Sequence, residues 1–202
     1  DKAAEAFNRT DTPVVLAGTK DNREEFASVT IDYKKADTEA LNLMMHDGKK
    51  NLAIVVGDED AVVNGENRIP AYQEFIKENN LGEPHIYTGI RDYSDGYNLY
   101  PQLVKDGIDG VIVTRDISSV GIMNSAMDAG KKIPEDLEIV TASATQLASV
   151  VRPALTTIKQ PLYDMGAVAM RMLTKLMNNE EVDETHIELP YELVKKQSTA
   201  NR

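Results

Sequence analysis

The sequence has no cysteine among its 202 residues. A disulfide scaffold, a thiolate metal site and a cysteine nucleophile are therefore excluded. No apolar run approaches the ~18 residues of a membrane-spanning helix, and no signal peptide opens the chain, so we expect a cytoplasmic protein without membrane association. With 22 Lys and Arg against 33 Asp and Glu, the net charge of −11 argues against nucleic acid binding by this segment itself.

Motifs that carry common catalytic chemistry are also missing. The sequence contains no G-x-x-x-x-G-K-[ST] phosphate loop, no G-x-G-x-x-G, no H-E-x-x-H and no G-x-S-x-G. Its three histidines, His46, His85 and His186, are isolated from one another along the chain. We therefore predict that the protein is not an enzyme, and we predict no metal site and no cofactor.

The chain does contain an alternation of short apolar runs and helical patterns. The runs cover residues 13–18, 51–58, 85–89, 110–116, 137–143, 155–158 and 186–194. The helical patterns cover 34–47, 69–80, 95–106, 118–129 and 162–178, and residues 1–8 also have a helical pattern. Runs that are apolar on both faces are typical of strands covered by helices on both sides. The alternation predicts an α/β fold with a doubly wound parallel sheet.

A ligand site is predicted from this topology, because open α/β sheets bind ligands beyond the carboxyl ends of their strands. Arg68, Asp116 and Ser143 are at such positions. Asp116 is either a helix N-cap or a ligand carboxylate. Arg68 either binds a carboxylate, phosphate or sugar hydroxyl of a ligand or forms a surface ion pair with Glu66 or Glu74. The residues alone leave both pairs of alternatives open.

The helix predicted over 162–178 presents two kinds of surface. Its inward-facing stripe is predicted to consist of Leu162, Met165, Ala169, Met172, Leu173 and Leu176. Arg171 and Lys175 are one turn apart near its C-terminus, beside Tyr163 and Val168. These cations either dock an anionic, partly apolar partner such as a phosphorylated side chain, or form a solvated face that complements the helix dipole.

Several stretches resemble the effector-binding core of the lactose/galactose repressor family. They are residues 28–33 (SVTIDY), 47–55 (DGKKNLAIV) and the glycine, alanine and proline pattern over 121–139. Residues 151–175, VRPALTTIKQPLYDMGAVAMRMLTK, and the closing Gln197-Ser198-Thr199 are similar to its catabolite control protein A subgroup. The resemblance covers essentially the whole chain, and residues 151–175 carry its most specific part.

The resemblance implies a periplasmic-binding-protein-like core of two doubly wound subdomains in a homodimeric regulator of carbon catabolite repression. It assigns residues 1–31 and 160–179 to an N-terminal subdomain that is incomplete here. Residues 32–159 and 180–202 are assigned to a C-terminal subdomain. The helix-turn-helix domain that contacts operator DNA, and the first strands of the N-terminal subdomain, are expected upstream of Asp1.

In this subgroup the corepressor is the histidine-containing phosphocarrier protein phosphorylated on a serine. The residues of the regulator helix on which this corepressor docks correspond here to Tyr163, Asp164, Val168, Arg171, Met172 and Lys175. Arg171 and Lys175 are suited to the phosphoserine, which adds roughly two negative charges. Docking is expected to bias the relative orientation of the two subdomains.

The chain also departs from the family pattern at the predicted crevice. The family carries Gly-Phe-Asp where this chain has Thr141-Ala142-Ser143, so Ser143 replaces a carboxylate that holds sugar hydroxyls. Arg68 and Asp116 match effector positions, whereas Arg115 stands where a small or amide residue is usual. The crevice is therefore expected either to favour a phosphosugar or another anion over a neutral sugar, or to bind nothing tightly, and our hypothesis is weak modulation by a phosphosugar. Two other functions remain as alternatives to a regulator of carbon catabolite repression: a sugar- or phosphosugar-responsive repressor of a single operon, and a sugar-binding transport protein.

Overall fold

The computed structural model describes residues 12–20, 25–58 and 63–200, so the helix predicted over 1–8 lies outside the described residues. The chain divides into two compact units. Unit 1 combines the segment up to Asp32 with Pro161–Tyr191, and unit 2 combines Tyr33–Gln160 with Glu192–Arg202. The chain therefore passes between the units three times.

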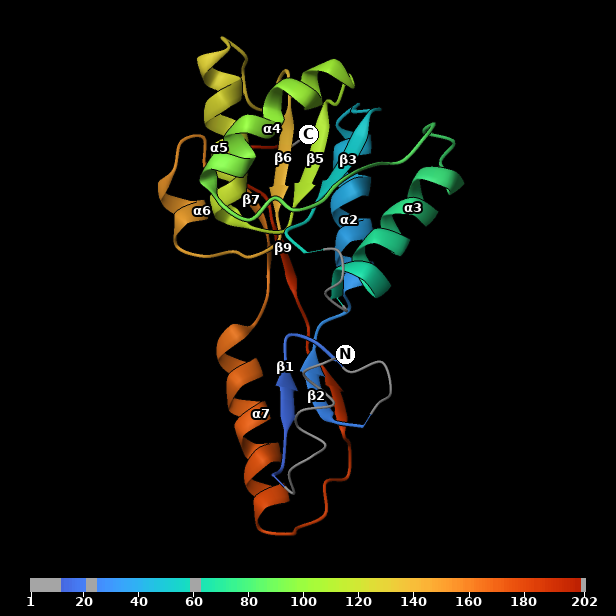
Figure 1. Ribbon diagram of the computed structural model, residues 1–202, viewed down its shortest axis with the longest axis vertical. Coiled ribbons are helices and arrows are strands. Elements are labelled where there is room, and N and C mark those ends of the chain that lie inside the picture. Colours follow the sequence, from blue (N-terminus) through green and yellow to red (C-terminus); the bar gives the residue numbers. More distant parts are fainter. Residues whose placement is uncertain (1–11, 21–24, 59–62, 201–202) are drawn as a thin grey trace. The chain divides into compact units, whose positions relative to one another are not determined.

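Unit 1 contains a small parallel sheet in the order β1-β2-β8 (Figure 1). Its strands are β1 (Val15–Ala17), β2 (Ala27–Thr30) and β8 (His186–Glu188). Helix α7 (Leu162–Met177) packs against β1 and β2. The sequence analysis did not predict β2, because this strand has only four residues, of which Ser28 and Thr30 are polar.

The strand predicted over 186–194 is in fact two strands in different units. Strand β8 pairs with β2 in unit 1, whereas β9 (Glu192–Val194) pairs antiparallel with β7 (Thr156–Lys159) in unit 2. Pro190 lies between them, and its missing N–H cannot support a continuous ladder. Consequently residues 180–191 lie in unit 1, and their assignment together with 32–159 was wrong.

Unit 2 contains a six-stranded sheet in the order β4-β3-β5-β6-β7-β9, and all its strands except β9 are parallel. The strands not yet described are β3 (Leu52–Val55), β4 (His85–Tyr87), β5 (Gly110–Val113) and β6 (Glu138–Thr141). The helices are α2 (Tyr33–His46), α3 (Ile69–Glu78), α4 (Tyr93–Lys105), α5 (Asp116–Asp128) and the short α6 (Leu147–Val150). This architecture confirms the predicted doubly wound α/β fold.

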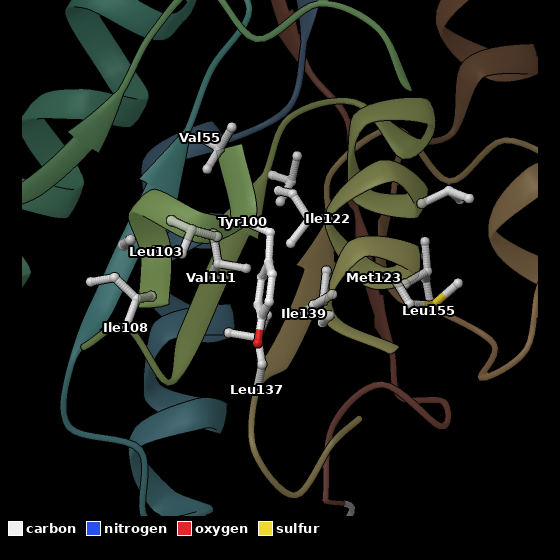
Figure 2. Close-up of a cluster of buried hydrophobic side chains, with 14 of the residues drawn as sticks. Val55, Tyr100, Leu103, Ile108, Val111, Ile122, Met123, Leu137, Ile139 and Leu155 are labelled. Carbon is white, nitrogen blue, oxygen red and sulfur yellow. The ribbon is translucent and has the colours of Figure 1, made fainter. Parts of the chain in front are cut away.

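Every residue of β3 and β5 is buried. Because side chains alternate along a strand, these strands place buried side chains on both faces of the sheet. Val111 and Val113 face a core that includes Leu103 of α4 and Ile122 of α5 (Figure 2). On the opposite face of β5, a side chain at Gly110 would collide with Leu52 and lie close to Met44 of α2. Helices therefore cover both faces, and the strand ends remain as the place where polar side chains gather.

Helix α4 begins two residues earlier than predicted because of a capping box. The Asp92 carboxylate accepts a hydrogen bond from the Asp95 amide at 2.8 Å, and the Asp95 carboxylate accepts one from the Asp92 amide at 3.3 Å. These bonds satisfy two amides that the first helical turn would otherwise leave without partners.

Candidate functional site

The four residues predicted for the crevice all lie in unit 2, and we refer to them as the strand-end site. Arg115 and Asp116 follow β5, and Ser143 follows β6. Strands β5 and β6 are neighbours, so the segments that leave their carboxyl ends adjoin each other. Arg68 ends a short π-helix, η1 (Val63–Arg68), between β3 and α3.

Asp116 is a buried carboxylate that holds the loop after β6. It accepts hydrogen bonds from Thr141 Oγ1 at 2.5 Å, from the Thr145 amide at 2.5 Å and from Thr145 Oγ1 at 2.6 Å. Asp116 is the first residue of α5, where the helix dipole favours a negative charge. The N-cap position belongs to Arg115, so the predicted capping role of Asp116 was wrong.

The loop that Asp116 holds contains Ser143, whose hydroxyl donates a hydrogen bond to the Thr114 carbonyl at 2.7 Å. The next residue, Ala144, has a φ of +51°, in the left-handed region that residues with a Cβ rarely adopt. The hydrogen bonds of Ser143 and Thr145, the residues before and after Ala144, therefore hold this strained conformation in place. Strain of this kind is often found at ligand sites.

Arg68 is 3% exposed and forms an ion pair with Asp37 of α2 at 2.5 Å. Its guanidinium carbon lies 4.8 Å from the centre of the Tyr33 ring. The predicted surface ion pair with Glu66 or Glu74 was wrong, because the buried partner is Asp37 and Glu74 pairs with Lys34 at 2.5 Å. Burial raises the pKa of Asp37, and the positive charge of Arg68 opposes that rise.

Arg115 is the exposed cation of the strand-end site. Its Nε lies 2.9 Å from the position that a Cβ would take on Gly57, directly beyond β3. A larger residue at position 57 would therefore displace the guanidinium. Among the residues that the structure describes, the Arg115 side chain has no hydrogen-bond or ion-pair partner, so it can receive an anion.

The structure brings these residues together only in part. Asp116, Ser143 and Arg115 share the adjoining ends of β5 and β6, whereas no direct hydrogen bond or ion pair between described residues joins Arg68 to them. In the same described ranges, no group of three or more acidic or histidine side chains could hold a metal ion. No described helix is long and apolar enough to cross a membrane.

The second predicted surface lies on α7 in unit 1. Asp164, Val168, Arg171 and Lys175 repeat every three or four residues and so line one side of the helix. Asp164 and Arg171 are exposed, and Tyr163 beside them is 87% exposed. Lys175 is half-buried, and its Nζ lies 3.9 Å from the Asp183 carboxylate.

Two predictions about α7 need correction. Met172 is only 4% exposed, so it belongs to the inward face and does not line the docking side. Leu162, which was predicted to face inward, is exposed, since it occupies the first position of the helix at the margin of the stripe. Met165 and Ala169 are buried, as predicted.

The sequence analysis did not identify two exposed methionines on α7. Met170 and Met177 follow Tyr163 at intervals of seven residues, and all three side chains are exposed. Because seven residues span two helical turns, they form an apolar stripe along one side of α7. Their spacing, together with their position off the inward stripe, is the sequence signal that could have revealed this surface.

Comparison with known proteins places these features in a family. Residues 41–199 match the model of a periplasmic binding protein-like domain. The HTH-type transcriptional regulator pepR1 of Lactobacillus delbrueckii subsp. lactis is 67% identical over 100% of this chain and 61% of its own length. Catabolite control protein A of Streptococcus mutans serotype c is 38% identical over 98% of this chain and 60% of its own length.

Among solved structures, the transcription regulator CcpA of Lactococcus lactis matches with a TM-score of 0.92 and 36% identity, over 98% of this chain and 73% of that one. The fold is thus that of a periplasmic binding protein-like domain. The chain belongs to the LacI family of transcription regulators, which confirms the predicted resemblance and the expectation that it is not an enzyme. It spans about 60% of the length of the curated relatives.

Proposed function

We propose that this chain is the effector- and corepressor-binding core of a cytoplasmic transcription regulator of carbon catabolite repression. In the full-length homodimer, a helix-turn-helix domain binds operator DNA. The serine-phosphorylated histidine-containing phosphocarrier protein docks on α7 of unit 1 and controls that binding. The observation that carries this proposal is that two cations, the exposed Arg171 and the half-buried Lys175, lie one turn apart on the same side of α7.

The charges of α7 set the orientation of the docked partner. Arg171 offers a planar fork of N–H donors, and Lys175, one turn away, adds a second positive charge for the same phosphate. Asp164 lies two turns before Arg171, roughly 10 Å along the axis, where its carboxylate repels a phosphate and attracts a cation of the partner. The phosphoserine is thereby directed to the C-terminal half of the helix.

The apolar contribution comes from Tyr163 and Val168. An exposed tyrosine supplies a large contact area with little loss of side-chain entropy, which makes it a frequent anchor of protein interfaces. The surface therefore combines an anion site with an adjacent apolar patch, as a phosphorylated protein partner requires.

Calorimetric titration of the full-length protein with the phosphocarrier protein, with and without its serine phosphate, tests this function. We expect binding only to the phosphorylated form, and Arg171→Glu should weaken it by at least tenfold, since like charges then meet at the interface. Lys131→Glu, the same charge change on an exposed residue of unit 2, is the control and should leave binding unchanged. Equal affinity for both forms would contradict the proposal.

A second candidate function, response to a phosphosugar, is supported by the exposed guanidinium of Arg115. An anion bound beyond the carboxyl ends of β3 and β5 would meet this cation, and no ion pair among the described residues would have to break. We expect millimolar glucose 6-phosphate or fructose 1,6-bisphosphate to raise the melting temperature by mass action. Arg115→Gln should abolish the increase, and unchanged melting of the unmodified protein would count against this effector class.

A further inference from the structure

A chain of contacts begins at the buried side chain of Arg68. Tyr33 and Asp37 are one turn apart on α2, and both face the Arg68 guanidinium. Asp37 is fully buried and holds the guanidinium from one side, while the Tyr33 ring lies against it. An ion pair and a ring contact together restrict a guanidinium to one position.

Within the part of the chain that the structure describes, this guanidinium has N–H donors without an acceptor. It carries five N–H donors, and among the described residues only one of them is matched, by Asp37 Oδ1. Asp37 Oδ2 is buried without a hydrogen-bond partner there. Buried polar groups are nearly always paired, so an unpaired one calls for a further partner.

The same contacts continue from Tyr33 toward the loop that contains Ser143. Tyr33 Oη donates a hydrogen bond to Gln160 Oε1 at 3.3 Å, and Gln160 Nε2 donates one to the Ala142 carbonyl at 2.9 Å. Ala142 immediately precedes Ser143. The strand-end residues that lack a direct bond to Arg68 are therefore connected to it through two side chains, Tyr33 and Gln160.

Tyr33 and Gln160 also occupy special places along the chain. The chain passes from unit 1 to unit 2 immediately before Tyr33, and it returns to unit 1 immediately after Gln160. One side-chain hydrogen bond thus joins the first and the last residue of the long segment of unit 2 that lies between the two passages. The sequence separates them by 127 positions, so only the fold brings them together.

We propose that Tyr33 couples ligand binding at Arg68 to the two chain passages at 32–33 and 160–161. A ligand oxygen, from a phosphate or a sugar hydroxyl, accepts hydrogen bonds from the unmatched N–H groups of Arg68. The held guanidinium fixes the Tyr33 ring, and the ring keeps its hydroxyl on Gln160. Asp37 and Tyr33 are positioning residues that act through Arg68, and this inference rests on the proposed role of the strand-end site in effector binding.

Tyr33→Phe in the full-length protein separates ligand binding from its consequence, because the ring stays over Arg68 while the bond to Gln160 is lost. Hydrogen exchange of peptides spanning the two passages is measured with and without glucose 6-phosphate, glucose or inorganic phosphate, each at a saturating concentration set by calorimetry. In the unmodified protein, the bound ligand should slow exchange at both passages by about fivefold or more. In Tyr33→Phe the ligand should bind with similar affinity but leave exchange unchanged.

Tyr100→Phe is the matched control, since Tyr100 is a buried tyrosine of unit 2, and this variant should respond to the ligand as the unmodified protein does. The three ligands distinguish a phosphate from a sugar as the source of the oxygen. Binding without slower exchange in the unmodified protein, or slowing that persists in Tyr33→Phe, would overturn the coupling alone. If none of the ligands binds, both the coupling and the effector role of the strand-end site fail.

Discussion

Asp116 and Thr145 are joined by two hydrogen bonds, in which the amide and the hydroxyl of Thr145 both donate to Asp116 Oδ2. The two residues are 29 positions apart and belong to segments that follow neighbouring strands. Their contact holds the loop that contains Ser143 against the start of α5. The shape of the strand-end site therefore depends on this one buried carboxylate.

Asp116→Ala should destabilise the protein by about 2–3 kcal/mol, because the buried hydroxyl of Thr141 and the amide and hydroxyl of the more exposed Thr145 all lose a charged acceptor. Urea unfolding of the full-length protein measures this loss. Asp136→Ala, which removes an exposed carboxylate that accepts one hydrogen bond from the Lys132 amide, is the control and should cost less than about 1 kcal/mol. Equal losses would show that burial of Asp116 contributes nothing.

Ala144→Gly should stabilise the protein or leave its stability unchanged. Glycine removes the steric cost of the left-handed conformation at residue 144, which is about 1–2 kcal/mol. The opposing contribution is the greater conformational entropy of the unfolded glycine variant, which costs about 0.4–1 kcal/mol of stability. The comparison is Ala142→Gly, two residues earlier, where a buried methyl group is lost and stability should fall. Melting temperatures of the two variants should thus change differently, and a clear decrease for Ala144→Gly would contradict the strain.

The pH dependence of stability should depend on Glu138. This buried side chain accepts a hydrogen bond from the Ala200 amide at 2.9 Å and lies against the carboxyl group of Asp47. Burial raises the pKa of Glu138 from its ordinary value near 4.5 to about 7, with a smaller contribution from Asp47. The folded state therefore keeps a proton that the unfolded state has already released.

The sign follows from this difference in proton binding. The stabilisation is fully present below pH 4.5 and is lost as the pH rises through about 7, in total roughly 3 kcal/mol. Glu138→Gln should flatten this part of the curve, which urea unfolding at several pH values measures. Glu135→Gln, an exposed neighbour, should leave the slope unchanged. A slope that survives in Glu138→Gln would assign the effect to another group.

Asp183→Asn should strengthen docking of the phosphorylated partner by about two- to threefold. The Asp183 carboxylate lies 3.9 Å from Lys175 Nζ and therefore competes with an incoming phosphate. Its side chain is 91% exposed, so the change should alter stability by less than about 0.5 kcal/mol. Calorimetry with the phosphorylated phosphocarrier protein measures the affinity, and Glu184→Gln is the control. Weaker binding by Asp183→Asn would contradict the competition.

Local patterns were sufficient to predict most of the secondary structure. The apolar runs over 51–58 and 110–116 were predicted as strands, and they contain β3 and β5. This prediction was possible because a strand buried on both faces needs apolar residues at every position. The 3.6-residue period identified the buried residues Met165 and Ala169 of α7. The four-residue strand β2 was not predicted, since half of its residues are polar and its pairing with β1 and β8 is long-range.

The sequence by itself determined the alternation of strands and helices, the family and the positions of the cations on α7, since each of these depends on residues that are near one another in the chain. The tertiary structure decided which polar side chains meet. Asp37 pairs with Arg68, Asp116 with Thr145, and Tyr33 with Gln160, across separations of 31, 29 and 127 residues. Buried polar groups must find partners, and the order of the strands in the sheet, which no local pattern specifies, determines which partners are within reach.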